Sequence, residues 1–123
     1  MAYNKYGNVK KTIDGIVVDS TVEARYYEKL KEDKRFGRIK MFVTHPPGYV
    51  LHDAYQLPGE RKASAIKYNA DFVVVYPDGT MRVIDVKGGP TTPEFKIKKK
   101  LFEAKYKMKL WEVRWKDGKW EEK

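Results

Sequence analysis

Two apolar segments, FVVVY at 72–76 and MRVIDV at 81–86, are joined by a few turn residues and give the clearest pattern in the chain. Short valine-rich runs bounded by proline, aspartate and glycine predict the two strands of an antiparallel hairpin. The order of proline and glycine in YPDGT favours a type I turn closed by a left-handed glycine, which makes a three-residue loop. Counting back from that loop places Asp71 opposite Asp85, whereas a two-residue loop would place Asp71 opposite Val86.

Helical spacing appears on both sides of this hairpin. In the first helical segment Ser20 is the predicted N-cap, Glu23 follows three residues later as in a capping box, and Gly37 ends the helix. The second helix is predicted over 93–106 with Thr92 as its N-cap, because proline suits the first helical position. Apolar residues spread around the second helix, which predicts that it packs on more than one side.

Shorter β-prone segments complete the order of elements as β-β-α-β-(β)-β-β-α-β. This order predicts an α/β (α+β) fold, with one mixed central sheet flanked by helices in a single domain over 12–123. Residues 1–11 are expected to be a loose basic arm, and 45–67 a variable basic loop region with one weak strand. The other β-prone segments are KTIDGIVV with its Asp-Gly turn, RIKMFVTH and KLWEVRW.

The amino-acid composition favours some classes of function and excludes others. The 123 residues carry 26 lysines and arginines against 17 acids, a net charge of +9, which suggests a polyanionic partner, although a merely soluble basic protein would show the same excess. The absence of cysteine excludes disulfide scaffolds and thiolate metal sites. His45 and His52 stand alone in the weakly patterned region and are interpreted as loop residues. No segment resembles a membrane span or signal peptide, so we expect a cytoplasmic protein without a membrane partner.

The acids of the hairpin are the first candidates for chemistry. Side chains alternate across a strand, so Asp85 and Lys87 share one face, and the three-residue loop brings Asp71 to the same face. Like charges directly opposite each other destabilise a sheet. Either the two carboxylates share a proton, or Lys87 neutralises them, or they hold a hard divalent cation. The plainer alternative is that both acids lie in solvent at the strand ends.

Glu23 lies in the apolar stripe of the first helix. Each helical residue advances by about 100°, which places Glu23 among Val22, Tyr26, Tyr27 and Leu30. It is thus the one charged residue on the face expected to pack against the sheet, at least as far as residue 32. The alternative is that Glu23 serves only the capping box.

Glu23 on a first helix, Asp71 at a strand start and the tripeptide Asp85-Val86-Lys87 on the next strand occur in this order before a basic helix. This arrangement resembles the PD-(D/E)xK nuclease superfamily, which has the restriction-endonuclease-like fold. DSTVEARYYEKL is similar to the first helix of archaeal-type Holliday junction resolvases, and the chain from about residue 4 to 106 resembles small phage and prophage proteins of the superfamily. The sequence departs from many members in carrying Asp85 rather than glutamate.

The resemblance implies roles for these residues. Asp71 and Asp85 would hold Mg²⁺, for which Mn²⁺ is expected to substitute, with the Val86 carbonyl as a further ligand. Glu23 would complete the site directly or through water, and Lys87 would lie beside the attacking water and the phosphate. Residues expected to contact DNA are Ser20, Arg61, Lys62, Lys96, Lys98, Lys99 and Lys100.

The expected function is that of a metal-dependent DNA endonuclease selective for branched DNA. A homodimer is expected, because two symmetric cuts across a junction require two active sites. Two alternatives stay open: a nuclease that acts on linear duplex or flap DNA, and a non-catalytic DNA-binding module of the same fold.

Overall fold

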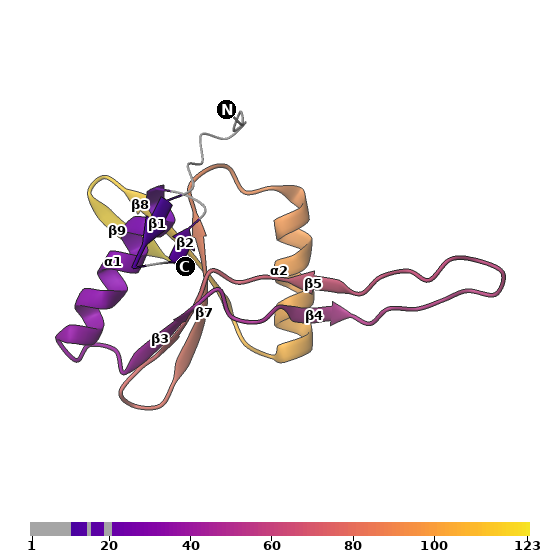
Figure 1. Ribbon diagram of the computed structural model, residues 1–123, viewed down its shortest axis with the longest axis horizontal. Coiled ribbons are helices and arrows are strands. Elements are labelled where there is room, and N and C mark those ends of the chain that lie inside the picture. The colour runs from indigo at the N-terminus through magenta and orange to yellow at the C-terminus, as the bar shows by residue number, and fades with distance from the viewer. Residues whose placement is uncertain (1–10, 15, 19–20) are drawn as a thin grey trace.

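The computed structural model describes residues 11–14, 16–18 and 21–123, and it has an α/β (α+β) fold (Figure 1). The expected basic arm, apart from its last residue Lys11, and the predicted N-cap Ser20 lie outside the described residues. The elements are β1 (Lys11–Ile13), β2 (Ile16–Val18), α1 (Thr21–Arg35), β3 (Met41–Thr44), β4 (Tyr49–His52), β5 (Ile66–Tyr68), β6 (Phe72–Val75), β7 (Met81–Lys87), α2 (Pro93–Tyr106), β8 (Leu110–Lys116) and β9 (Lys119–Glu122).

A mixed five-stranded sheet forms the centre, with strand order β3-β6-β7-β8-β9. The β7–β8 pair is parallel and the other neighbours are antiparallel. Helix α2 makes the crossover that a parallel pair requires. Strands β1–β2 and β4–β5 form two separate two-stranded sheets, whereas the sequence predicted one mixed central sheet.

Each face of the central sheet is covered by one helix, as predicted. Alternate residues of β6 and β7 point to opposite faces, so each strand contributes to two apolar cores. The core on the α1 side contains Tyr26, Tyr27, Leu30, Ile39, Phe72, Val74, Ile84 and Val113. The core on the α2 side contains Leu51, Tyr68, Ala70, Val73, Val83, Phe95, Phe102 and Leu110.

Local signals at the hairpin and at the ends of the helices have the predicted structure. The Tyr76 N–H donates to the Thr80 carbonyl at 2.8 Å and Gly79 has φ +89°, which confirms the three-residue loop. Gly37, at φ +75°, follows the end of α1. At the start of α2 the Thr92 hydroxyl accepts the Phe95 N–H at 3.1 Å. These features fix the register that positions the acids.

The region 45–67, expected to be a variable loop with one weak strand, contains that strand as β4, which pairs with the unpredicted strand β5 in a hairpin. Strands β4 and β5 pair, residues 53–65 extend beyond them, and Tyr55 and Ala63 form one further bridge. Figure 1 shows this segment projecting from the body of the protein past α2. The sequence pattern of this region is weak because its strands are held by long-range aromatic contacts, such as Tyr49 with Phe102.

Candidate metal site

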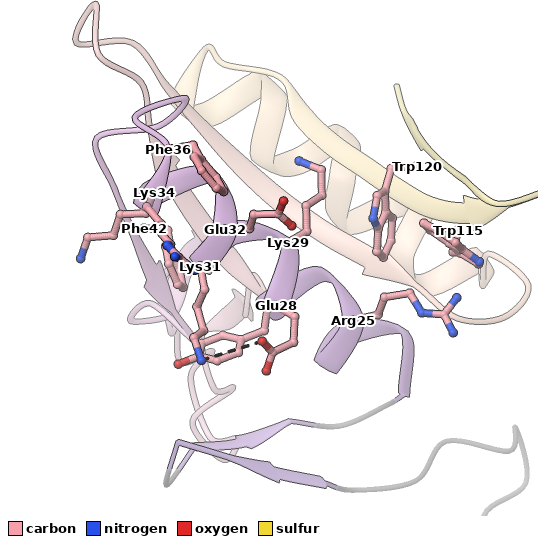
Figure 2. A pocket seen from close by; sticks show the side chains of 12 residues that line it. Arg25, Glu28, Lys29, Lys31, Glu32, Lys34, Phe36, Phe42, Trp115 and Trp120 are labelled. Carbon is pink, nitrogen blue, oxygen red and sulfur yellow. Dashed lines mark ion pairs between the residues drawn. The ribbon is translucent and has the colours of Figure 1, made fainter.

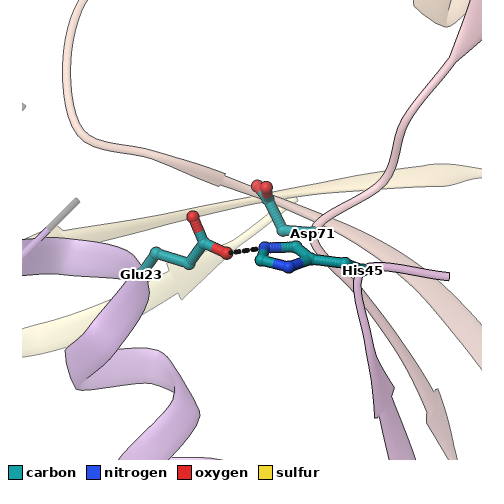
Figure 3. Close-up of side chains that lie close together, drawn as sticks. All are labelled: Glu23, His45 and Asp71. Atoms are coloured by element: carbon teal, nitrogen blue, oxygen red, sulfur yellow. Dashed lines mark hydrogen bonds and ion pairs between the residues drawn. The ribbon is translucent and has the colours of Figure 1, made fainter. Parts of the chain in front are cut away.

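Three side chains from separate elements meet at one end of the central sheet (Figure 3). Glu23 lies in the first turn of α1, His45 directly follows β3, and Asp71 directly precedes β6. One possible ligand atom from each residue lies within 4.8 Å of the others. Glu23 and Asp71 were predicted as site residues, whereas His45 was not.

Glu23 is buried, as its place in the apolar stripe predicted. Only 3% of the residue is exposed, and its carboxylate Oε1 lies 2.7 Å from the His45 Nε2. Because burying a charged group without a partner is costly, this contact accounts for part of the environment that Glu23 requires.

His45 is held in place by its backbone as well as by Glu23. Its N–H donates to the Asp71 carbonyl at 2.9 Å, and its φ of +50° turns the chain away from the strand. The side chain is 40% exposed, so one part of the ring faces Glu23 while another remains accessible. His45 is thus an exposed loop residue, as predicted, but it does not stand alone, because its ring contacts Glu23. The signal that locates it is the register of β3 with β6, which pairs Thr44 with Phe72.

Asp71 lies where the ladder between β6 and β7 ends. The last pair is Phe72 with Ile84, and beyond it the Asp71 Oδ2 accepts the Val86 N–H at 2.7 Å. The predicted register is thus correct, although regular pairing stops one residue before Asp71 and Asp85. Burial raises the pKa of Asp71 well above its ordinary value, and the negative charges of Asp85 and Glu23 raise it further. The Val86 N–H and Lys87 oppose this rise.

Asp85 is buried on β7, and each of its carboxylate oxygens has a partner. The Tyr68 hydroxyl donates to Oδ1 at 2.6 Å, and the Lys87 ammonium lies 2.7 Å from Oδ2. The Lys87 Nζ also lies 3.0 Å from the centre of the Phe95 ring. Lys87 is therefore the ion-pair partner of Asp85, one of the alternatives considered above. Tyr68, at the base of the β4–β5 hairpin, was not predicted, because its approach depends on long-range strand placement.

The predicted DNA contacts are spread over two other parts of the surface. Arg61 and Lys62 lie on the projecting hairpin, and Lys96 and Lys100 are exposed on α2. The other two lysines of α2 that were predicted to contact DNA have acidic partners: Lys98 lies 3.2 Å from Glu94, and Lys99 lies 2.6 Å from Glu112. Glu112 is the register partner of Asp85 on β8. Lys99 therefore reaches the strand position next to Asp85.

A separate hollow lies along the outer side of α1 (Figure 2). None of its lining residues is among the predicted site residues. The side chains there are mixed in charge, with Lys31 3.8 Å from Glu28 and the Arg25 guanidinium 4.7 Å from the centre of the Trp115 ring. Four cations of this hollow, Arg25, Lys29, Lys31 and Arg35, are therefore engaged by acids or aromatic rings.

The donors at the end of the sheet suit a divalent cation. Carboxylate oxygens are the ligands that Mg²⁺, Ca²⁺ and Mn²⁺ accept, and an imidazole nitrogen is accepted by transition metals. Glu23, His45 and Asp71 would supply the donors that lie closest together. Asp85 is near enough for its charge to raise the pKa of Asp71, so it is the next carboxylate available. For Val86 the observed contact is the N–H that donates to Asp71, which is a different group from the predicted carbonyl ligand.

Comparison with known proteins identifies the family of the chain. Residues 3–120 match the family described as "Protein of unknown function (DUF1064)". The chain belongs to this family. All the site residues of this DUF1064 protein lie within the matched range. No curated protein and no solved structure matches the chain. Within the described part of the chain, neither helix is long and apolar enough to cross a membrane.

Proposed function

We propose that the protein is a divalent-metal-dependent endonuclease that hydrolyses phosphodiester bonds of DNA. One observation carries the proposal: the carboxylates of Glu23, Asp71 and Asp85 approach one another, next to Lys87, at one end of the sheet. Their order along the chain is the one that prompted the resemblance to PD-(D/E)xK nucleases.

The electrostatics of the site support a bound cation. Burial together with the neighbouring charges raises the pKa of Asp71, so the acids repel one another when all are ionised. A cation that is held by these oxygens removes that repulsion. A protein that only bound DNA would gain nothing from buried acids, because carboxylates repel phosphate. This argument favours the nuclease over the non-catalytic module.

When bound, a divalent cation acidifies water and neutralises charge on the phosphate during hydrolysis. Glu23, His45 and Asp71 would hold the ion, and Asp85 would add a further oxygen. Lys87 is positioned by Asp85 and by the Phe95 ring, which fixes a positive charge beside the carboxylates. That charge would stabilise the phosphate oxygens as negative charge develops on them.

The charge of the chain supports DNA as the substrate. The chain carries nine more positive than negative charges, and this net charge attracts a polyanion such as DNA. The attraction offsets the repulsion between the phosphates and the acids of the site. Selectivity for branched DNA and action as a homodimer belong to the proposal as its finer part. Mg²⁺ is the proposed cofactor, and the nitrogen donor of His45 supports Mn²⁺ as an alternative.

The test compares a labelled four-way DNA junction with linear duplex of the same sequence, in Mg²⁺, in Mn²⁺ and in EDTA. Asp85→Asn is expected to abolish cleavage and to retain DNA binding. Asp117→Asn, in the exposed β8–β9 turn where asparagine tolerates the positive φ, is the matched control and should cut normally. Paired cuts in the junction alone would support the resolvase, and equal cutting of both substrates would support a general nuclease. Binding without any cutting by the wild type would refute the proposal in favour of the non-catalytic module.

A further inference from the structure

The segment 53–65, which we call the hairpin arm, contributes nothing to the interior of the described structure. Residues 53–62 are all exposed, and neither apolar core includes a residue of the arm. A two-stranded ribbon on its own is marginally stable in water. The arm therefore makes little contribution to holding the fold together, and its projection from the body presents it to a partner (Figure 1).

The β4–β5 hairpin that carries the arm is flanked along the chain by two residues of the candidate metal site. His45 precedes the hairpin and Asp71 follows it, and a backbone hydrogen bond of 2.9 Å joins these two residues. Tyr68, the last residue of β5, donates a hydrogen bond from its hydroxyl to the Asp85 carboxylate. A phosphate bound at the metal site therefore lies close to the base of the arm.

The base of the arm is fixed against α2. The Tyr106 hydroxyl donates to the Val50 carbonyl at 2.8 Å, and Tyr49 packs edge-to-face on Phe102 with 5.0 Å between ring centres. Because these contacts hold β4 in place, the direction of the arm relative to the site is determined by the fold.

The returning segment, from the tip of the arm into β5, carries three cations and one acid, Glu60, whereas the outgoing segment carries Asp53 and no cation. Arg61 and Lys62 lie exposed near the tip and Lys67 lies exposed near the base, all on the same returning segment. Tyr55 and Leu57 are 53% and 54% exposed on the other segment. Cations spaced along one edge of a ribbon can contact successive phosphates, while the other edge faces the groove.

We propose that the arm lies in the major groove of the duplex that flanks the reacting phosphate. This inference rests on the proposed nuclease function and adds the position of the duplex to it. A two-stranded β-ribbon fits the major groove. At about 3.3 Å per residue, the segment from His52 to Gly59 spans about 23 Å. Base pairs are spaced by about 3.4 Å, so the arm covers about six or seven pairs on one side of the cut.

The test is a hydroxyl-radical footprint in EDTA, where the proposed nuclease does not cut. In a shortened variant, Asn-Gly replaces residues 53–65 and joins His52 to Ile66, which are register partners. Wild type should protect about six or seven base pairs on one side of its cut site more than the shortened variant does. The variant should also lose about two from the slope of log K against log salt, because two phosphate contacts are removed.

A double substitution, Arg61→Gln with Lys62→Gln, keeps the test valid if the shortened chain fails to fold. It should reduce the salt slope by a similar amount and weaken binding to all DNA sequences alike. Lys34→Gln with Arg35→Gln is the matched control, because these exposed cations lie at the end of α1 away from Glu23. The control should bind as wild type does.

The outcomes separate this inference from the proposed function. If wild type cuts DNA but the footprint and salt slope are unchanged by shortening, the arm inference is wrong and the nuclease stands. If shortening instead converts a dimer to a monomer without changing the footprint, the arm contacts a second chain and the inference is again wrong. If wild type neither binds nor cuts DNA, both proposals fail.

Discussion

Asp71→Asn should make the protein more stable in EDTA and less stable in Mn²⁺ than the wild type. The substitution removes a negative charge from the acid cluster and keeps the size of the side chain. The amide oxygen of asparagine can still accept the Val86 N–H that Asp71 accepts at 2.7 Å. The variant therefore loses mainly the negative charge. The change in its free energy of unfolding measures the electrostatic repulsion among the acids of the site.

The size of the effect follows from the geometry. Ligand oxygens of Glu23 and Asp71 lie within 4.8 Å of each other. Two unit charges at that separation repel by about 3 kcal/mol at an effective dielectric constant of about 20. Lys87 and the Val86 N–H offset part of this repulsion. We expect a net stabilisation of about 1–2 kcal/mol for Asp71→Asn in EDTA at pH 8, which is an increase in Tm of about 4–8 °C.

The pH dependence has a defined sign. Burial raises the pKa of Asp71 in the folded protein above the value in the unfolded chain. The folded state therefore binds the proton more tightly, and the wild type loses stability as the pH rises from the usual aspartate range through the raised pKa. The gain in stability of Asp71→Asn over the wild type should be large at pH 8. It should disappear near pH 4, where the side chain at position 71 is neutral in both folded proteins.

A bound cation should reverse the order of stability, so that the wild type becomes more stable than Asp71→Asn. Mn²⁺ at one hundred times its Kd adds about 2.7 kcal/mol to the wild type, and the variant lacks one ligand and should gain much less. Thermal unfolding at pH 4 and pH 8, with EDTA and with Mn²⁺, measures all four conditions, and Asp117→Asn serves as the surface control. A wild type that is the more stable form in EDTA at pH 8, or an order that Mn²⁺ leaves unchanged, would refute the assignment of the cluster as a metal site.

Three further substitutions test neighbouring contacts. His45→Gln should lower the affinity for Mn²⁺ more than that for Mg²⁺, because the imidazole nitrogen is a donor that Mg²⁺ seldom takes; equal losses in calorimetric titrations would exclude His45 as a ligand. Tyr68→Phe should destabilise the protein by about 1–3 kcal/mol through loss of the hydrogen bond to Asp85, and Tyr49→Phe, a partly buried tyrosine of the adjacent strand, should cost less in the same denaturant titration. Thr92→Ala should cost about 1 kcal/mol by removing the N-cap of α2, and an unchanged midpoint would contradict that role.

Turns, helix caps and helix faces depend on residues close together in the sequence, so they were predictable from the sequence. The turn YPDGT fixed the hairpin register, because the positions of proline and glycine determine the loop length. The α2 cap followed from the side-chain chemistry of Thr92 in the same way. The burial of Glu23 followed from the period of the helix alone. These local patterns alone predict two elements of the candidate site, the approach of Asp71 to Asp85 and the inward-facing glutamate.

The residues that sequence reasoning missed depend on contacts between distant segments. His45 approaches Asp71 only because β3 pairs with β6, and no local pattern around His45 indicates that partner. Tyr68 reaches Asp85 only because β5 pairs with β4 and packs on α2. The two missed residues share a further property: each lies at one end of the hairpin that was interpreted as a loop. The β4–β5 pairing thus places Tyr68 at the site and also forms the base of the projecting arm, whereas His45 reaches the site through the separate β3–β6 pairing.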